Sequence, residues 1–133
     1  MKYLSTRNDS LNQSFNDILY QGLSKDGGLY LPREWPTINL DKLINLSYQE
    51  VATEIIHPFT SEDINKQDLS EIIRKSYLNF KDDKIAPIYN LDKNKFLLEL
   101  FYGPTYAFKD YALQFLNHLF VHVLQNSSKK ITI

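Results

Sequence analysis

The sequence predicts an α/β protein in two parts. Residues 1–83 form a mostly helical N-terminal module, and residues 84–133 form the first strand–helix–strand part of a larger α/β domain, which is incomplete in this chain. Apolar residues recur at helical spacing through most of the first part. A charged stretch, residues 81–84, follows them, and two apolar strand-like segments and an amphipathic helix come after it.

Composition supports a folded protein and excludes several kinds of site. The chain has 133 residues, of which 43% are hydrophobic and 14% aromatic, as in globular domains. Its net charge of −1 gives no basic excess for nucleic acid or an anionic membrane surface. The absence of cysteine excludes disulfides and thiolate metal sites. With no membrane-spanning run and no secretory signal, we expect a cytoplasmic protein.

The N-terminal segment predicts a strand and a helix. Residues 1–7 are typical of a short strand. Residues 9–23 carry apolar side chains at helical spacing, with Asp9 or Ser10 as the N-terminal cap. Gly22 offers a stop for this helix, because glycine readily ends a helix in a left-handed conformation.

A turn and two helices are predicted next. Residues 26–28, Asp-Gly-Gly, predict a turn. Residues 40–46 predict one short helix. Ser47 and Glu50 have the spacing of a capping box for a further helix that ends near Pro58.

The clearest helical pattern covers residues 66–80, with a start at Ser61 or at the acidic pair 62–63. One apolar face of this helix is opposite its charged side chains. The members of that face are Leu69, Ile72, Ile73, Ser76 and Tyr77.

The second part predicts a strand–helix–strand unit. Residues 86–91 and 95–102 are strand-like and are separated by a turn at 92–94. The second of these is almost continuously apolar, which is typical of a strand buried on both faces. A long amphipathic helix follows, and residues 127–133 resemble the start of another strand.

Lys109 lies where the predicted strand gives way to the helix. Gly103 and Pro104 break the strand, and Thr105 or a neighbour can cap the helix. Lys109 precedes the apolar helix face by three, four and seven residues, so we expect it to be partly buried in the first turn. Burial and the positive end of the helix dipole both favour a neutral amine, which Schiff-base chemistry requires. The alternative is a solvated lysine at a helix start, with Asp110 capping or pairing locally.

Three segments together resemble the threonine synthase family. They are "STR" at residues 5–7, "GLSKDGGLYLP" at 22–32 and "GPTYAFKDYALQFL" at 103–116. The resemblance is to the bacterial and fungal branch of these fold-type II enzymes, which use pyridoxal phosphate (PLP). It implies that Lys109 is both the cofactor-binding residue, through a Schiff base to PLP, and a catalytic residue.

The resemblance also implies a reaction in threonine biosynthesis. Threonine synthase is a carbon–oxygen lyase that converts O-phospho-L-homoserine and water to L-threonine and phosphate. The glycine-rich loop that holds the PLP phosphate follows later in the family, whereas the four glycines of this chain all precede Lys109. We therefore expect PLP binding and activity in the full-length protein, and no activity in this chain alone.

Other candidates are expected to be structural. His118 and His122 have a metal-ligand spacing but no third ligand, and His57 suggests a helix terminus. Residues 5–7 could bind an anion, but a strand end is the simpler interpretation.

Tyr106 and Phe108 could line a cofactor site, although we expect at least one of the two rings to pack in the core.

The second hypothesis for the whole chain is a non-catalytic helical interaction module. Because residues 95–133 would leave strand edges and an apolar helix face uncovered, we also expect self-association or partial disorder there.

Overall fold

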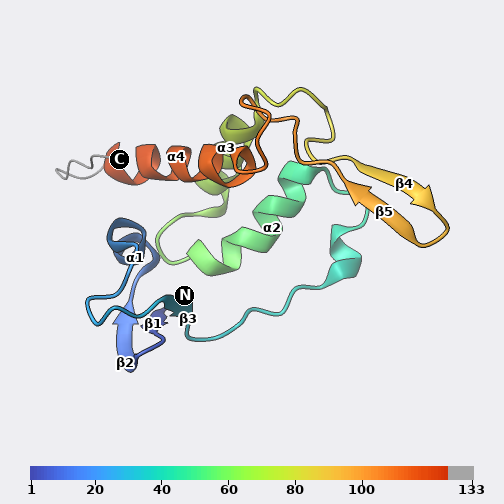
Figure 1. The fold of residues 1–133 in the computed structure, drawn as a ribbon. Coiled ribbons are helices and arrows are strands. Elements are labelled where there is room, and N and C mark those ends of the chain that lie inside the picture. The colour runs from blue at the N-terminus through green and yellow to red at the C-terminus, as the bar shows by residue number, and fades with distance from the viewer. Residues whose placement is uncertain (126–133) are drawn as a thin grey trace. The chain divides into compact units, whose positions relative to one another are not determined.

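The computed structural model describes residues 1–125, so the strand predicted over 127–133 lies outside the described residues. The chain divides into two compact units, residues 1–44 with 53–69 and residues 45–52 with those from 70 onward. The predicted boundary at residues 83 and 84 stays a prediction. The elements in Figure 1 are β1 (Tyr3–Ser5), β2 (Asn8–Gln13), α1 (Phe15–Gln21), β3 (Tyr30–Pro32), a 3₁₀ turn (Leu40–Leu43), α2 (Tyr48–Thr60), α3 (Lys66–Tyr77), β4 (Ile88–Asp92), β5 (Lys95–Leu98) and α4 (Asp110–Gln125).

The first unit contains an antiparallel sheet in the order β2-β1-β3. Strand β1 confirms the first predicted strand. The helix predicted over residues 9–23 is wrong in its first half, because residues 8–13 form β2 and pair with β1. Helix α1 starts only after Ser14, which forms a capping box with Asp17. Its predicted stop is confirmed, since Gly22 has a φ of 68° and donates its N–H to the Ile18 carbonyl.

Tyr3 joins this sheet to the core of the first unit. Its ring lies 6.3 Å from that of Phe15, and its hydroxyl donates to the Phe59 carbonyl at 2.7 Å. Asp63 accepts a hydrogen bond from the Phe15 N–H at 2.9 Å. Burial, with a smaller contribution from the Asp63 charge, raises the pKa of Tyr3 to about 12. The hydroxyl is therefore held in its neutral, donating form.

Capping residues predicted the start of α2 correctly, whereas the predicted ends and lengths of several helices differ from the structure. The capping box before α2 is confirmed, with the Ser47 N–H donating to Glu50 at 2.8 Å. Pro58 lies inside α2 and does not end it. Helix α3 starts after Asn65, whose side chain accepts the Asp68 N–H, and not at residues 61–63. The helix predicted over residues 40–46 is only a 3₁₀ turn. The predicted face of α3 is confirmed, since all five of its members are buried.

Strands β4 and β5 form an antiparallel hairpin in the second unit, coloured yellow to orange in Figure 1. The predicted turn between them is confirmed, but β5 ends at Leu98. Burial of β5 on both faces is wrong for this chain, because every residue of the two strands is exposed. Among the described residues no third strand joins this sheet. The predicted apolar face of α4 is also largely open, since Leu113 and Leu116 are exposed and Leu119 is buried.

Candidate functional site

Lys109 is the residue immediately before α4 in the second unit. Its carbonyl accepts the N–H of Leu113 at 2.9 Å and that of Ala112 at 3.2 Å, so Lys109 occupies the N-cap position. The predicted place at a helix start is confirmed. The predicted partial burial is wrong, because Lys109 is exposed and the face it was expected to join is largely open. Accessibility, and not burial, is the local property that the structure gives this amine.

Asp110, the next residue, is buried and paired locally. It is 4% exposed, and its two carboxylate oxygens accept hydrogen bonds from Thr105, one from the backbone N–H at 2.7 Å and one from the hydroxyl at 2.8 Å. The expected local pairing of Asp110 is confirmed. Thr105 binds the carboxylate and does not cap the helix as predicted.

Residues 103–110, which we call the lysine loop, fold closely around this carboxylate. A Cβ on Gly103 would overlap the Asp110 side chain and come within 2.8 Å of its Cγ, so this position has room for glycine only. The Tyr106 N–H donates to the Gly103 carbonyl at 3.1 Å, and the Asp110 N–H donates to the Ala107 carbonyl at 3.0 Å. Tyr106 takes a left-handed φ of 61°, which is uncommon for a bulky residue.

The outer side of the lysine loop presents aromatic rings. Tyr106 is 62% exposed and Phe108 is 66% exposed, so the expected packing of at least one of them is wrong. The Lys81 ammonium donates to the Tyr106 hydroxyl, and the Lys81 N–H donates to the Tyr102 carbonyl at 2.9 Å. Lys81 thus holds the loop from the charged stretch that precedes β4.

An aromatic column supports the start of α4 from inside the second unit. The rings of Tyr48, Tyr77, Phe80 and Tyr111 meet edge to face in that order, with centroids 5.1, 5.1 and 4.9 Å apart. The Tyr77 hydroxyl donates to the Tyr111 carbonyl at 3.0 Å, and burial is the main cause that raises the pKa of Tyr77. The Tyr111 hydroxyl donates to the carbonyl of buried Ile85 at 2.7 Å, where Ile85 has a φ of 64°.

Sequence reasoning missed this column, because its members come from three separate segments of the chain, around residue 48, residues 77–80 and residue 111. The only local signal is that Tyr77 and Phe80 are three residues apart at the end of a helix.

Residues 5–7 are engaged within the first unit. Ser5, which is buried, donates its hydroxyl to Asp26 at 2.8 Å. The Thr6 hydroxyl accepts the Leu29 N–H at 3.0 Å, and Arg7 donates to the Asp26 carbonyl at 3.1 Å. Their contacts therefore support the structural interpretation of this segment. The Gly28 N–H, followed by the Ser5 and Ser24 hydroxyls and the Arg7 charge, lowers the pKa of Asp26.

The three histidines lie within helices, His57 in α2 and His118 and His122 in α4. His118 Nδ1 lies 2.9 Å from the Gln114 carbonyl of its own helix, and His57 lies inside α2 instead of ending it. Within residues 1–125 no three His, Cys, Asp or Glu side chains are grouped to hold a metal ion. None of the helices described here is long and apolar enough to cross a membrane.

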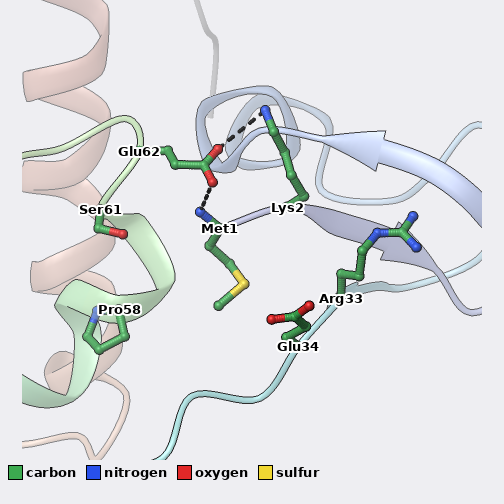
Figure 2. Close-up of a pocket in the computed structure, with 7 residues that line it drawn as sticks. All are labelled: Met1, Lys2, Arg33, Glu34, Pro58, Ser61 and Glu62. Carbon is green, nitrogen blue, oxygen red and sulfur yellow. Dashed lines mark ion pairs between the residues drawn. The ribbon is translucent and has the colours of Figure 1, made fainter.

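A depression of about 400 Å³ lies in the first unit (Figure 2). One of its lining residues, Glu62, pairs with the Met1 ammonium at 2.5 Å and with Lys2 at 3.4 Å. None of the predicted site residues lines it. The lining residues are Met1, Lys2, Arg33, Glu34, Pro58, Ser61 and Glu62.

Comparison with known proteins identifies the family of this chain. The family model described as threonine synthase N terminus matches residues 2–77, more than half of the chain. The chain belongs to the threonine synthase family. Threonine synthase of Pseudomonas aeruginosa is 40% identical over 136 aligned residues, which cover 100% of this chain and 29% of the relative. The Saccharomyces cerevisiae enzyme is 41% identical, covering 97% of this chain and 27% of its own length.

Solved structures of the family have the same fold. A PLP-bound threonine synthase from Brucella melitensis has a TM-score of 0.92 and 41% identity, covering 98% of this chain and 29% of that one. The yeast threonine synthase structure has a TM-score of 0.87 and 38% identity, covering 95% of this chain and 27% of that one. The predicted family and the predicted α/β class are confirmed. The chain spans less than a third of the length of these relatives.

Proposed function

We propose that this chain is the N-terminal part of a PLP-dependent threonine synthase. The full-length protein would be a carbon–oxygen lyase that converts O-phospho-L-homoserine and water to L-threonine and phosphate. The observation that carries the proposal is an exposed lysine amine at the start of α4 in a chain that superimposes on a PLP-bound threonine synthase. The whole-chain match to enzymes of this kind does not favour the alternative of a non-catalytic helical module.

The described residues fit one attachment point of the cofactor. Lys109 offers an accessible amine to the PLP aldehyde, and the exposed rings of Tyr106 and Phe108 precede it in the sequence. The family resemblance implies a glycine-rich loop for the PLP phosphate after the lysine, and because the four glycines, at 22, 27, 28 and 103, all precede Lys109, we place that anchor outside residues 1–133. When bound, PLP supplies the electron sink that lets protons leave carbon atoms near the substrate amine.

Lys109 has two roles in this proposal. Its Nζ would hold PLP covalently before the substrate binds, and would then move protons at the α and β carbons of the substrate. The exposure of Lys109 at the start of α4 leaves its amine free to reach the substrate in the second role. With only one anchor for PLP, this chain alone is proposed to be inactive.

The surroundings of the reaction are also proposals. We place the protein in the cytoplasm, with a small-molecule substrate and without nucleic acid or a membrane as partner. The isolated chain should self-associate, since apolar side chains of the β4–β5 hairpin such as Ile88 and Phe96 are exposed. Light scattering that shows a clean monomer would contradict the association.

Borohydride trapping tests the role of Lys109. The full-length protein is incubated with PLP, reduced with borohydride, digested and mapped by mass spectrometry. We expect the phosphopyridoxyl label on the peptide that contains Lys109, and no label in Lys109→Ala. Lys84→Ala, which removes another exposed lysine of the second unit, serves as the control and should label normally. A colourless full-length protein without label would favour the non-catalytic module.

A further inference from the structure

Asp110 is a buried carboxylate for which the described residues provide no cation. It is 4% exposed, and the ion pairs of residues 1–125 do not include it. Buried carboxylates are normally paired or fully hydrogen-bonded, because desolvation of the charge is costly. Here both oxygens are bonded to Thr105, and the carboxylate lies at the favourable, positive end of α4.

An exposed aspartate would be enough to stabilise a helix start. The burial of Asp110 therefore indicates an additional role.

The two bonds close the lysine loop into a ring. Thr105 is joined to the Asp110 side chain, and the Asp110 N–H is bonded to the Ala107 carbonyl. Gly103 packs against the same side chain with no free space. Lys109 is enclosed by this ring, with its own carbonyl committed to the first turn of α4. Its backbone is thus held from both sides, while its side chain is exposed.

We propose that Asp110 is a positioning residue for Lys109. By bonding Thr105, its carboxylate holds the lysine loop against α4 and so sets the point and direction from which the Lys109 side chain leaves the backbone. This proposal rests on the proposed role of Lys109 in binding PLP. The proposed role requires that residue 110 form two hydrogen bonds of fixed geometry with Thr105. The negative charge of Asp110 is less important.

Three variants of the full-length protein separate geometry from charge and from stability. Asp110→Ala removes both contacts. Asp110→Asn keeps the shape, since its amide oxygen can accept the Thr105 N–H and its NH₂ group can donate to the Thr105 hydroxyl. Asp26→Ala is the matched control, because it removes a carboxylate that also bonds a hydroxyl and a backbone N–H, but in the first unit. Each variant is reduced with borohydride in the presence of PLP, and amide hydrogen exchange of residues 103–113 is measured without PLP.

We expect Asp110→Ala to lower the labelled fraction of Lys109 by about tenfold, because small displacements of a reacting group are costly. Its exchange across the lysine loop should rise. Asp110→Asn should label within about threefold of the wild type, as a shape-preserving change allows. Asp26→Ala should label normally.

Several results would overturn the proposal. Wild-type labelling and exchange in Asp110→Ala would overturn it and leave the proposed function standing. Equal losses in Asp110→Ala and Asp26→Ala would reduce the role to general stability. A loss in Asp110→Asn as large as in Asp110→Ala would refute the geometric account. Failure of the wild type to label at Lys109 would overturn the proposed function itself, and this proposal with it.

Discussion

Two segments of the molecule use the same hydrogen-bonding device for different ends. In the Asp-Gly-Gly turn, residues 24–28, the Asp26 carboxylate accepts a serine hydroxyl and a backbone N–H, both at 2.8 Å. In the lysine loop, Asp110 accepts a threonine hydroxyl and a backbone N–H. Each segment also contains a glycine where an added Cβ would overlap a neighbour, Gly28 against Ser5 and Gly103 against Asp110.

The difference lies in what each device connects. Asp26 is exposed and reaches Ser5, 21 residues away, so the turn is fastened to strand β1, with the exposed Lys25 next to Asp26 and no helix start beside it. Asp110 is buried and reaches Thr105, five residues away, so it fastens a loop to itself and leaves Lys109 exposed. The comparison teaches that a fastened loop is not evidence of function by its chemistry alone. Because each segment presents an exposed lysine, Lys25 or Lys109, the distinguishing features are the place of Lys109 at the start of α4 and the burial of its neighbour Asp110.

The largest expected effect is at the two glycines. Gly103→Ala and Gly28→Ala should each lower the free energy of unfolding by about 1–3 kcal/mol, because overpacking forces neighbours to move. Urea unfolding of the full-length variants measures this. Only Gly103→Ala should also lower borohydride labelling of Lys109. An equal loss of labelling in Gly28→Ala would remove the functional distinction between the two segments.

Removing the Thr105 hydroxyl should cost more stability than removing the Ser5 hydroxyl, because the acceptor Asp110 is buried and the acceptor Asp26 is exposed. Thr105→Val leaves a buried carboxylate oxygen without its donor and should cost about 1–3 kcal/mol in the local opening free energy from hydrogen exchange. Ser5→Ala should cost less, about 1 kcal/mol, since exposed Asp26 keeps the Gly28 N–H and water. The reverse order would show that separation in the sequence matters more than burial.

In each unit a tyrosine hydroxyl donates a hydrogen bond to a backbone carbonyl, and the two bonds should contribute similarly to stability. Tyr111→Phe releases the Ile85 carbonyl and Tyr3→Phe releases the Phe59 carbonyl, each at about 1 kcal/mol. The raised pKa of Tyr3 means that its stabilisation is complete below pH 10, the ordinary value, and is lost as the pH rises through about 12. Urea unfolding at several alkaline pH values should show the stability difference between wild type and Tyr3→Phe shrinking over that window. A constant difference would contradict the burial of this hydroxyl.

The smallest effect is expected from Asp26→Asn, because a single amide oxygen can keep the hydrogen bonds from the Ser5 hydroxyl and the Gly28 N–H. The charge interaction with Arg7 is lost, and the contribution of the Ser24 hydroxyl is weakened. Since the folded-state pKa of Asp26 is lowered, its contribution is complete above the ordinary value of 3.8 and disappears as the pH falls through the lowered pKa. Thermal unfolding between neutral and acid pH should therefore show the two proteins converging in acid. Divergence in acid would mean that the carboxylate is not stabilised in its ionised form.

Local signals predicted the parts of the fold that depend on neighbours in the sequence. The Ser47–Glu50 capping box and the buried face of α3 are of this kind, since each is contained within one or two helical turns. The spacing of residues 9–23 predicts a helix where β2 forms, because pairing with the separate segment β1 stabilises the strand more than the local spacing favours a helix.

For the site, the sequence predicted which residue matters better than how it is held. The place of Lys109 at a helix start could be predicted from the glycine and proline before it. Its exposure could not, because burial of the α4 face depends on packing partners that spacing alone does not specify. The Tyr111 contact likewise depends on Ile85, 26 residues away, and the Asp110–Thr105 contacts, although local, depend on a loop conformation that residue spacing does not specify.

Ile85 has a consequence for how variants of this protein should tolerate change. A β-branched residue with a left-handed φ of 64° stores unfavourable backbone energy, of order 1–3 kcal/mol. The Tyr111 hydroxyl grips the carbonyl of this same residue, one position after the start of α4. Ile85→Asn would lower this backbone energy, because asparagine tolerates a left-handed φ, but it would also remove a buried apolar side chain. Position 85 lies outside the lysine loop, so a substitution there changes the support that the start of α4 receives through Tyr111 while every residue of the loop keeps its identity.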